Sequence, residues 1–247
     1  MRRKISFALF ALLLIRVAAP AQVTLIPRAG ISLSNYRITQ QQNVMTRRGT
    51  GVVAGAAINV PLPKVAWLTL QPELYYVQKA FSSSKRETIL GVAGNIRWQA
   101  SRRSDYLEMP LLAKATLGKG RLRGFGNAGP SLGYLLGGND AFAIVVDGQK
   151  VPITGSTGTD KSFGGVNRLE VSLQVGGGLG LKIGPGTLLA EARYGLGLTH
   201  FIKAHNAYVT VENPELGEGR TYFKVPADQK SRSFTFTCGY AVPLGKN

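Results

Sequence analysis

The sequence predicts an all-β chain that folds as an eight-stranded antiparallel up-and-down transmembrane β-barrel. First, eight segments alternate apolar with small or polar residues, and each is longer than the usual soluble strand of about 5–6 residues. Second, the connections between these segments are alternately very short and long. Third, 31 of the 247 residues are Gly and only 17% are charged, below the roughly 25% of a soluble domain. The polar faces are therefore made mostly of small residues.

The composition excludes several other classes of protein. Hydrophobic residues make up 44% of the chain, which is too high for a disordered polyelectrolyte. The single cysteine, Cys238, excludes an intramolecular disulfide and a cysteine-rich metal site. After the N-terminal segment, no run approaches the 18 or so apolar residues of a membrane-spanning helix.

The N-terminal segment has the order of a Sec-type secretory signal. The basic start Met1–Lys4 precedes the mostly apolar Ile5–Ile15, and Ala19–Ala21 has the A-x-A pattern of a cleavage site. The apolar run is too short to span a bilayer as a helix, which needs about 20 residues. We expect a signal peptide over 1–21 and a barrel domain over 22–247, and the residue directly after the cleavage site is not a cysteine that could carry a lipid anchor.

Each predicted strand has two different faces, because successive side chains of a strand point to opposite sides. In one segment, Leu188, Ala190 and Ala192 alternate with Leu189, Glu191 and Arg193. A tilted strand crosses the membrane in about 9–11 residues, and every segment is long enough. The expected strands are 23–37, 50–62, 65–79, 104–118, 121–136, 166–184, 186–200 and 232–244.

The connections predict which way the barrel faces. Pro63-Lys64, Lys119-Gly120 and Pro185 form very short turns. Outer-membrane barrels have short periplasmic turns and longer extracellular loops. With an even strand number, both termini then lie on the periplasmic side. The expected long loops are 38–49, 80–103, 137–165 and 201–231.

The number of strands remains open between eight and ten. Within the third long loop, 141–147 and 150–154 flank Gly148-Gln149, which predicts a hairpin projecting outward. Similar extensions near 89–99 and 207–225 could raise the number of strands to ten.

The two faces suit a lipid exterior and a crowded lumen. Leu, Val, Ala and aromatic residues form the outer face, which includes Cys238, and the inner face is rich in Gly, Ser and Thr. Prolines within the strands predict local bulges, because proline removes a ladder hydrogen bond; they are Pro27, Pro72, Pro110 and Pro130. Aromatic residues near strand ends fit interface girdles: Trp67, Tyr75, Tyr76, Trp98, Tyr134, Tyr194 and Phe201.

Several segments resemble a known family. Leu70–Tyr76, Tyr106–Leu112 and Gly126–Leu136 resemble the outer-membrane β-barrel domain of Bacteroidetes, the porin-family or PorT-like group. Arg28–Asn35 is similar to the first strand of this family, Arg193–Thr199 to its seventh and Phe236–Tyr240 to its last. The resemblance implies a small barrel in the bacterial outer membrane, similar to the OmpA and OmpX transmembrane domains, and implies no catalytic site.

Charged residues at inward positions are the candidate functional residues. They form either a polar pathway or ligand-gated plug, or a salt-bridged filling that replaces a hydrophobic core. Unpaired charges are costly in a desolvated lumen, so opposite charges should pair. The candidates are Arg28, Glu73, Glu108, Lys114, Arg121, Arg123, Arg168, Glu170, Lys182, Glu191 and Arg193.

The sequence predicts neither an enzyme nor a cofactor. His200 and His205 are the only histidines, and their spacing favours neither a nucleophile–base pair nor a metal site. Gly176–Gly180 lacks the G-x-G-x-x-G spacing and its acidic ribose partner. We therefore expect no catalytic, cofactor-binding or metal-binding residues.

The basic excess predicts an anionic partner outside the cell. The formal net charge is +17, and Arg47-Arg48, Lys85-Arg86 and Arg102-Arg103 are paired in long loops. An exported barrel does not meet nucleic acid, so we hypothesise contacts with outer-membrane lipid and lipopolysaccharide phosphates; ordinary solvation is the alternative. Three functions remain: a structural or surface-interaction barrel that binds partners through its loops, a narrow porin-like diffusion channel, or a PorT-like secretion-assembly factor.

Overall fold

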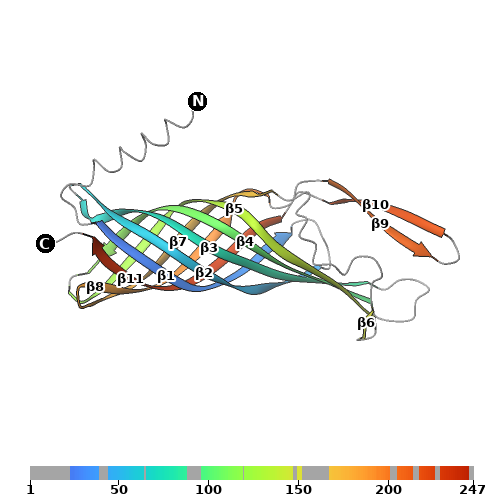
Figure 1. The fold of residues 1–247 in the computed structure, drawn as a ribbon, viewed down its shortest axis with the longest axis horizontal. Coiled ribbons are helices and arrows are strands. Elements are labelled where there is room, and N and C mark those ends of the chain that lie inside the picture. The colour runs from blue at the N-terminus through green and yellow to red at the C-terminus, as the bar shows by residue number, and fades with distance from the viewer. Residues whose placement is uncertain are drawn as a thin grey trace, which may run out of the picture.

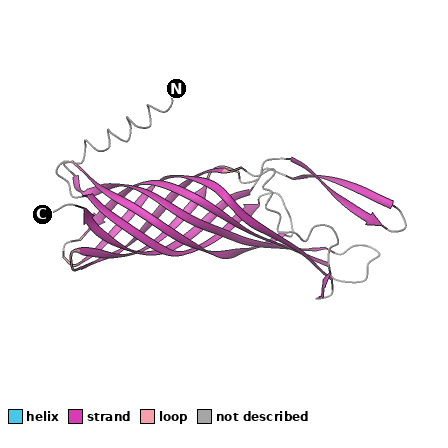
Figure 2. Ribbon diagram, viewed as in Figure 1, coloured by secondary structure: helices cyan, strands magenta, loops and turns pink. Residues whose placement is uncertain are grey.

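The structure is a computed structural model, and every regular element in its described part is a β-strand (Figure 2). Among the described residues, no helix is long and apolar enough to cross a membrane. The expected signal peptide, 1–21, lies outside the described residues. These are 23–38, 44–63, 65–87, 96–118, 120–146, 149–151, 167–200, 205–213, 217–225 and 229–244.

Eight antiparallel strands close into a barrel, with each strand hydrogen-bonded to its neighbours in sequence (Figure 1). The order is β4-β3-β2-β1-β11-β8-β7-β5, and the pairing of β4 with β5 closes it. The barrel strands are β1 (Val23–Ile38), β2 (Val44–Leu62), β3 (Val65–Glu87), β4 (Ile96–Leu117), β5 (Leu122–Val146), β7 (Leu169–Ile183), β8 (Gly186–Gly197) and β11 (Gln229–Leu244). The predicted all-β, eight-stranded, up-and-down barrel is thus confirmed.

The tight turns gather at one end of the barrel, here called the short-turn end. They connect β2 to β3, β4 to β5 and β7 to β8, and the first and last strands pair there through Val23 and Leu244. Gly118 and Gly184 have φ of 95° and 58°, a conformation that L side chains rarely adopt. Glycine therefore allows two of these turns to reverse the chain. The opposite end is called the loop end.

Three strands continue far beyond the length that crosses a membrane. β3 has 23 residues, β4 has 22 and β5 has 25, whereas about 9–11 residues suffice to cross. Their outer parts stay paired, with Glu87 opposite Ile96 and Ile96 opposite Val146. The prediction that 80–103 and 137–165 are loops was therefore wrong over 80–87 and 96–103 and over 137–146. Strand pairing uses backbone groups, so these polar stretches remain strand without an alternating pattern.

Two hairpins project at the loop end. The predicted hairpin is confirmed where Val145 pairs with Lys150 and Ile144 with Val151, but Gln149, predicted in its turn, pairs with Val146 and begins β6 (Gln149–Val151). A second hairpin, β9 (His205–Asn213) with β10 (Gly217–Val225), forms its own two-stranded sheet. Neither hairpin enters the barrel wall, so the described barrel has eight strands and not ten.

The prolines do not produce the predicted bulges. Pairing has the same register on both sides of Pro27, Pro72, Pro110 and Pro130. The register shifts lie elsewhere, between Arg48 and Val53, between Pro61 and Leu62, and between Asp105 and Tyr106. A proline lacks one N–H and so removes one ladder bond. The neighbouring residues are sufficient to keep the register.

The barrel wall is apolar outside and polar inside. Outward side chains such as Val52, Leu173, Val175 and Phe236 are exposed, as suits contact with lipid, and Cys238 is exposed among them. Inward positions hold most of the buried polar residues: Arg28, Ser32, Ser34, Gln71, Glu73, Lys79, Ser104, Glu108, Lys114, Asn127, Ser131, Glu170, Ser172, Gln174, Glu191, Arg193 and Ser231.

The predicted aromatic girdle is partly correct. Trp67 and Tyr134 are exposed on the outer wall, and Tyr76 and Tyr194 are half-buried. Tyr75 is buried, and its placement in the girdle was wrong. Tyr75 lies two residues after Glu73 on β3, so the two have the same parity, meaning that their side chains point to the same side of the strand. For both residues that side is the lumen. The side chains of Trp98 and Phe201 lie outside the described residues.

Candidate functional site: a charge-filled lumen

The inward face of the barrel brings charged residues from distant strands together at mid-height. Strand alternation places Glu191 and Arg193 of β8 on the same inward side, two residues apart. Along β1 the inward side chains run from Thr24 through Ile26 and Arg28 to Tyr36. Further inward side chains therefore lie on both sides of the charged layer, towards the short-turn end and towards the loop end.

The first ionic cluster centres on Arg193 and joins three strands. Its guanidinium lies 2.5 and 3.0 Å from the two carboxylate oxygens of Glu73, and its Nη2 lies 2.5 Å from Oε1 of Glu191. Arg28 of β1 also donates to Glu191 and lies 3.7 Å from Glu73. Two carboxylates and two guanidiniums thus neutralise one another in a buried, bidentate arrangement.

The second ionic cluster centres on Lys79 and lies nearer the loop end. Its Nζ lies 2.8 Å from Glu108 Oε1 and 2.6 Å from Glu170 Oε1. Ser231 of β11 donates to the same oxygen of Glu170 at 2.7 Å. The ammonium also lies 4.7 Å from the ring centroid of Tyr106, within the range of a cation–π contact.

Gln174 links the two clusters, and two further amide side chains bind the first cluster. Gln174 donates to Glu108 Oε2 at 3.0 Å and accepts from Arg193 Nη1 at 3.1 Å. Asn127 donates to Glu191 at 2.9 Å, and Gln71 donates to Glu73. The linked residues come from β1, β3, β4, β5, β7, β8 and β11, so the network ties the wall together across its lumen.

Apolar layers border the network on both sides. Towards the short-turn end lie Ile26, Ala57, Phe125, Leu189 and Ala241. Towards the loop end lie the packed side chains of Tyr36, Phe81, Tyr106 and Leu135. A cavity beside the network, lined by Tyr75, Glu108, Arg193 and others, has a volume of about 20 Å³. That is room for about one water molecule, so the middle of the described lumen is filled.

Most of the charges expected in the lumen meet in this layer. Arg28, Glu73, Glu108, Glu170, Glu191 and Arg193 take part in the network. Lys114 is buried but lies on the short-turn side of the network.

The other expected charges lie outside the network. Arg123 and Lys182 lie on the inward side of their strands and Arg121 lies in the turn before β5, but all three are exposed, because they lie where the barrel opens at the short-turn end. Arg168 is exposed just before β7 begins. Position along a strand, and not parity alone, decides whether a charge is buried.

The sequence interpretation missed Lys79 and the amides that join the clusters. Lys79 has the same parity as Glu73 and Tyr75, but it is the last residue of its predicted strand, next to an expected loop. Gln71, Asn127 and Gln174 also have inward parity. Listing every polar residue of that parity would have found all four.

The histidines and the potential metal ligands can be placed only in part. His200 is exposed, and the side chain of His205 lies outside the described residues. No group of three His, Cys, Asp or Glu side chains able to hold a metal occurs in the described part of the chain. The carboxylates of the lumen are engaged by cations and amides.

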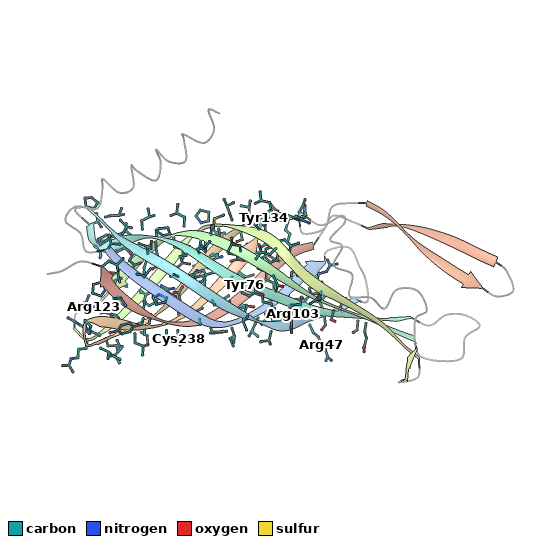
Figure 3. The ribbon with its side chains drawn as sticks, in the orientation of Figure 1. Arg47, Tyr76, Arg103, Arg123, Tyr134 and Cys238 are labelled. Carbon is teal, nitrogen blue, oxygen red and sulfur yellow. The ribbon has the colours of Figure 1, made fainter. Side chains whose placement is uncertain are left out.

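The outer wall changes character towards the loop end. On β3, Tyr76 donates to Asp105 at 2.8 Å and Gln78 donates to the same carboxylate at 3.1 Å. Beyond this polar belt, Arg47 and Arg103 are exposed (Figure 3). Arg48 is exposed as well, and its guanidinium lies 5.2 Å from the ring centroid of Phe234. An exposed basic rim thus follows the apolar band.

A closed barrel with an apolar exterior and a polar, filled lumen defines a transmembrane β-barrel protein, because closure leaves no unpaired edge in lipid. The model of the family described as "Outer membrane protein beta-barrel domain" matches residues 20–203. The chain belongs to this family and is an outer-membrane β-barrel protein. No curated protein matches the sequence.

Similar solved structures include other small barrels. Neisserial surface protein A is 9% identical, with 89% of this chain and 97% of that chain covered and a TM-score of 0.37. Ail of Yersinia pestis, in complex with a heparin analogue, is 12% identical over 89% and 98%, with a TM-score of 0.36. OprG of Pseudomonas aeruginosa is 13% identical over 89% and 96%, with a TM-score of 0.38.

Proposed function

We propose that this protein is a closed barrel that anchors a surface-interaction platform in the outer membrane. The observation that carries the proposal is the ionic network that fills the lumen. A solute passing through would have to displace Arg193 and Lys79 from their carboxylates. Separating buried ion pairs costs several kcal/mol, which argues against the porin-like alternative.

Conductance across a planar lipid bilayer tests the closed lumen. The full chain, refolded and inserted alone, is expected to give no stepwise conductance under conditions in which a general porin gives clear steps. Slower gel migration after boiling than before shows that the inserted protein is folded. Reproducible single-channel steps from the unaltered protein would refute a closed barrel and favour the channel.

The loop end is the proposed interaction surface, with lipopolysaccharide phosphate as its first partner. Arg47, Arg48 and Arg103 are exposed just beyond the polar belt of Tyr76 and Asp105. With the short-turn end in the periplasm, these guanidiniums stand at the level of the outer leaflet, where charge-assisted bonds to phosphate form. The side chains of Lys85 and Arg86 lie outside the described residues.

Retention of lipopolysaccharide during purification tests this contact. The triple variant R47Q/R48Q/R103Q is expected to retain several-fold less lipopolysaccharide per barrel. The variant R121Q/R123Q/K182Q removes the same charge from the opposite end and should retain as much as the unaltered protein. Equal retention by all three proteins would mean that the rim arginines are merely solvated.

A secretion-assembly role and a binding surface for protein partners are two further proposals. Resemblance of Leu70–Tyr76 and Gly126–Leu136 to the Bacteroidetes, PorT-like group supports a role in assembling a secretion machine. Its test is co-purification with secretion-complex subunits from the outer membrane of the native cell. Protein partners would bind through the long connections 38–49, 80–103, 137–165 and 201–231, where β3, β4 and β5 already extend as paired strands.

A further inference from the structure

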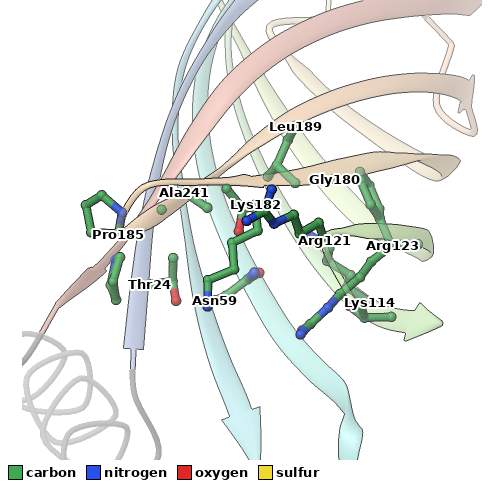
Figure 4. A pocket seen from close by; sticks show the side chains of 15 residues that line it. Thr24, Asn59, Lys114, Arg121, Arg123, Gly180, Lys182, Pro185, Leu189 and Ala241 are labelled. Carbon is green, nitrogen blue, oxygen red and sulfur yellow. The ribbon is translucent and has the colours of Figure 1, made fainter. Parts of the chain in front are cut away.

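The short-turn end of the barrel contains an open cavity separate from the ionic network. Its volume is about 340 Å³, within the usual range for small-molecule sites. Figure 4 shows the side chains around it. Thr24, Asn59, Thr116 and Thr187 contribute polar groups to its wall. On the inner side, Phe125, Leu189 and Ala241 belong to the apolar layer that separates it from the network.

The charges around this cavity have one sign. Lys114, Arg121, Arg123 and Lys182 line it, and among the described residues of its lining there is no Asp or Glu. Strand alternation directs Lys114 of β4, Arg123 of β5 and Lys182 of β7 towards the lumen, and Arg121 lies in the turn just before β5. Like charges that converge in a confined cavity repel one another and raise the local concentration of anions. The ionic network, in contrast, pairs its cations with carboxylates.

Lys114 is the cation that most needs a ligand. Its exposure is only 3%, and its Nζ lies 4.2 Å from the ring centroid of Phe125. No carboxylate of the described residues lies within ion-pair distance of it. Across the cavity, the side-chain oxygen of Asn59 is buried without a hydrogen-bond donor. A flip of that amide would exchange its oxygen and nitrogen, so that its N–H groups could donate to a bound anion.

We propose that this cavity binds a phosphate-bearing anion that enters from the periplasmic side. Guanidinium groups match the geometry of phosphate oxygens, and the exposed Arg121 and Arg123 stand at the entrance while Lys114 lies deeper. The cavity has room for a molecule with two phosphate groups. The apolar layer and the network block further passage, so the anion is held and not transported.

Isothermal titration of the refolded full chain with inorganic pyrophosphate tests the site. The protein is held in a maltoside detergent, because a phosphocholine detergent would itself supply phosphate. The unaltered barrel is expected to bind one pyrophosphate, and R121Q/R123Q/K182Q to bind at least tenfold more weakly. K230Q/R168Q/R232Q removes three exposed cations near the loop end and should bind within twofold of the unaltered protein.

Two further arms identify what the site recognises. K114Q leaves the entrance intact and should still weaken binding about as much as the triple variant, with folding checked by the gel shift. Soluble dihexanoyl phosphatidylglycerol should compete with pyrophosphate if a lipid headgroup can supply the phosphate. The proposal is overturned if neither pyrophosphate nor the short-chain lipid binds, or if both triple variants lose affinity equally; binding of the short-chain lipid alone would identify a lipid headgroup as the source of the phosphate.

Discussion

At the scale of the residue, Arg193 joins the two carboxylates of the first ionic cluster. It makes four hydrogen bonds to Glu73 and Glu191. In R193Q those carboxylates keep only Arg28 as a charged partner, and breaking a buried pair in this way costs about 3–5 kcal/mol. We expect the free energy of unfolding in lipid vesicles, measured by urea titration, to fall by that amount.

The matched control for this prediction is R168Q. It makes the same substitution at an exposed arginine outside the network, and surface changes of this kind usually stay within about 0.5 kcal/mol. An R193Q barrel as stable as R168Q would mean that the network contributes nothing to stability. The charged side chains would then fill the lumen without stabilising the barrel.

Gly239 makes room for the side chain of Arg28. A Cβ added at Gly239 would overlap Cγ of Arg28 and lie 2.7 Å from the carbonyl oxygen of Pro27. Overpacking of this kind costs about 1–3 kcal/mol, so G239A should unfold at lower urea concentration. G124A is the control, because a Cβ at Gly124 meets nothing within 4 Å, and it should unfold with the unaltered protein.

At the residue scale, the alternation of side chains along a strand was the signal on which the sequence assigned charges to the lumen. Glu73, Glu108, Glu170 and Glu191 were assigned to the lumen, and all four are buried there. Lys79 was missed because the strand was expected to stop at it. The pairing of charges from different strands could not be derived, since it depends on the stagger between β1, β3 and β8.

At the scale of the element, β9 and β10 form a unit that pairs with itself. Tyr208 lies opposite Tyr222, and the described register connects β9 with β10 alone. Replacing 204–227 with a short Gly-Ser linker should leave the barrel folded, because loop shortening affects closure entropy only slightly. We expect the gel shift on boiling to persist, with the midpoint of thermal unfolding within a few degrees.

A second deletion removes the outer part of β4, and unlike the loss of β9 and β10 it should make the barrel prone to aggregation. Its outer residues, Ile96 to Arg103, pair with both β3 and β5, so their loss would leave two strands with unpaired edges. Such edges favour aggregation. If deleting β9–β10 abolished the gel shift as well, the hairpin would have to support the barrel itself.

The element scale is also where sequence prediction was least complete. The alternation of Leu188 to Arg193 defines the membrane-crossing part of a strand, because lipid and lumen impose opposite polarity on its two faces. Outside the membrane both faces meet water, and that constraint disappears. The extensions of β3 and β5, such as Ala80–Glu87, therefore carry no period that marks them as strand.

At the scale of the whole molecule, connection lengths were enough to predict the topology. The short links at Pro63 and Pro185 define one end, and the closure of β4 on β5 completes the ring. The binding partner could not be predicted in this way, because the outward ends carry charges whose ligands the fold does not specify. A further property of the whole molecule is the position of the bilayer along the barrel wall, which can be measured.

Substitutions along β7 would locate the bilayer on the barrel. Val175 and Ile183 both point outward, with exposures of 53% and 47%, but Val175 lies at mid-strand and Ile183 at its short-turn end. Arginine on the lipid face costs about 2–4 kcal/mol at the midplane and about 0–1 near the interface. In urea titrations from lipid vesicles, we expect the free energy of unfolding of V175R to fall by about 2–4 kcal/mol and that of I183R to fall by about 0–1 kcal/mol. Equal losses would place the apolar band elsewhere on the wall, and negligible losses at both sites would contradict a lipid-facing exterior.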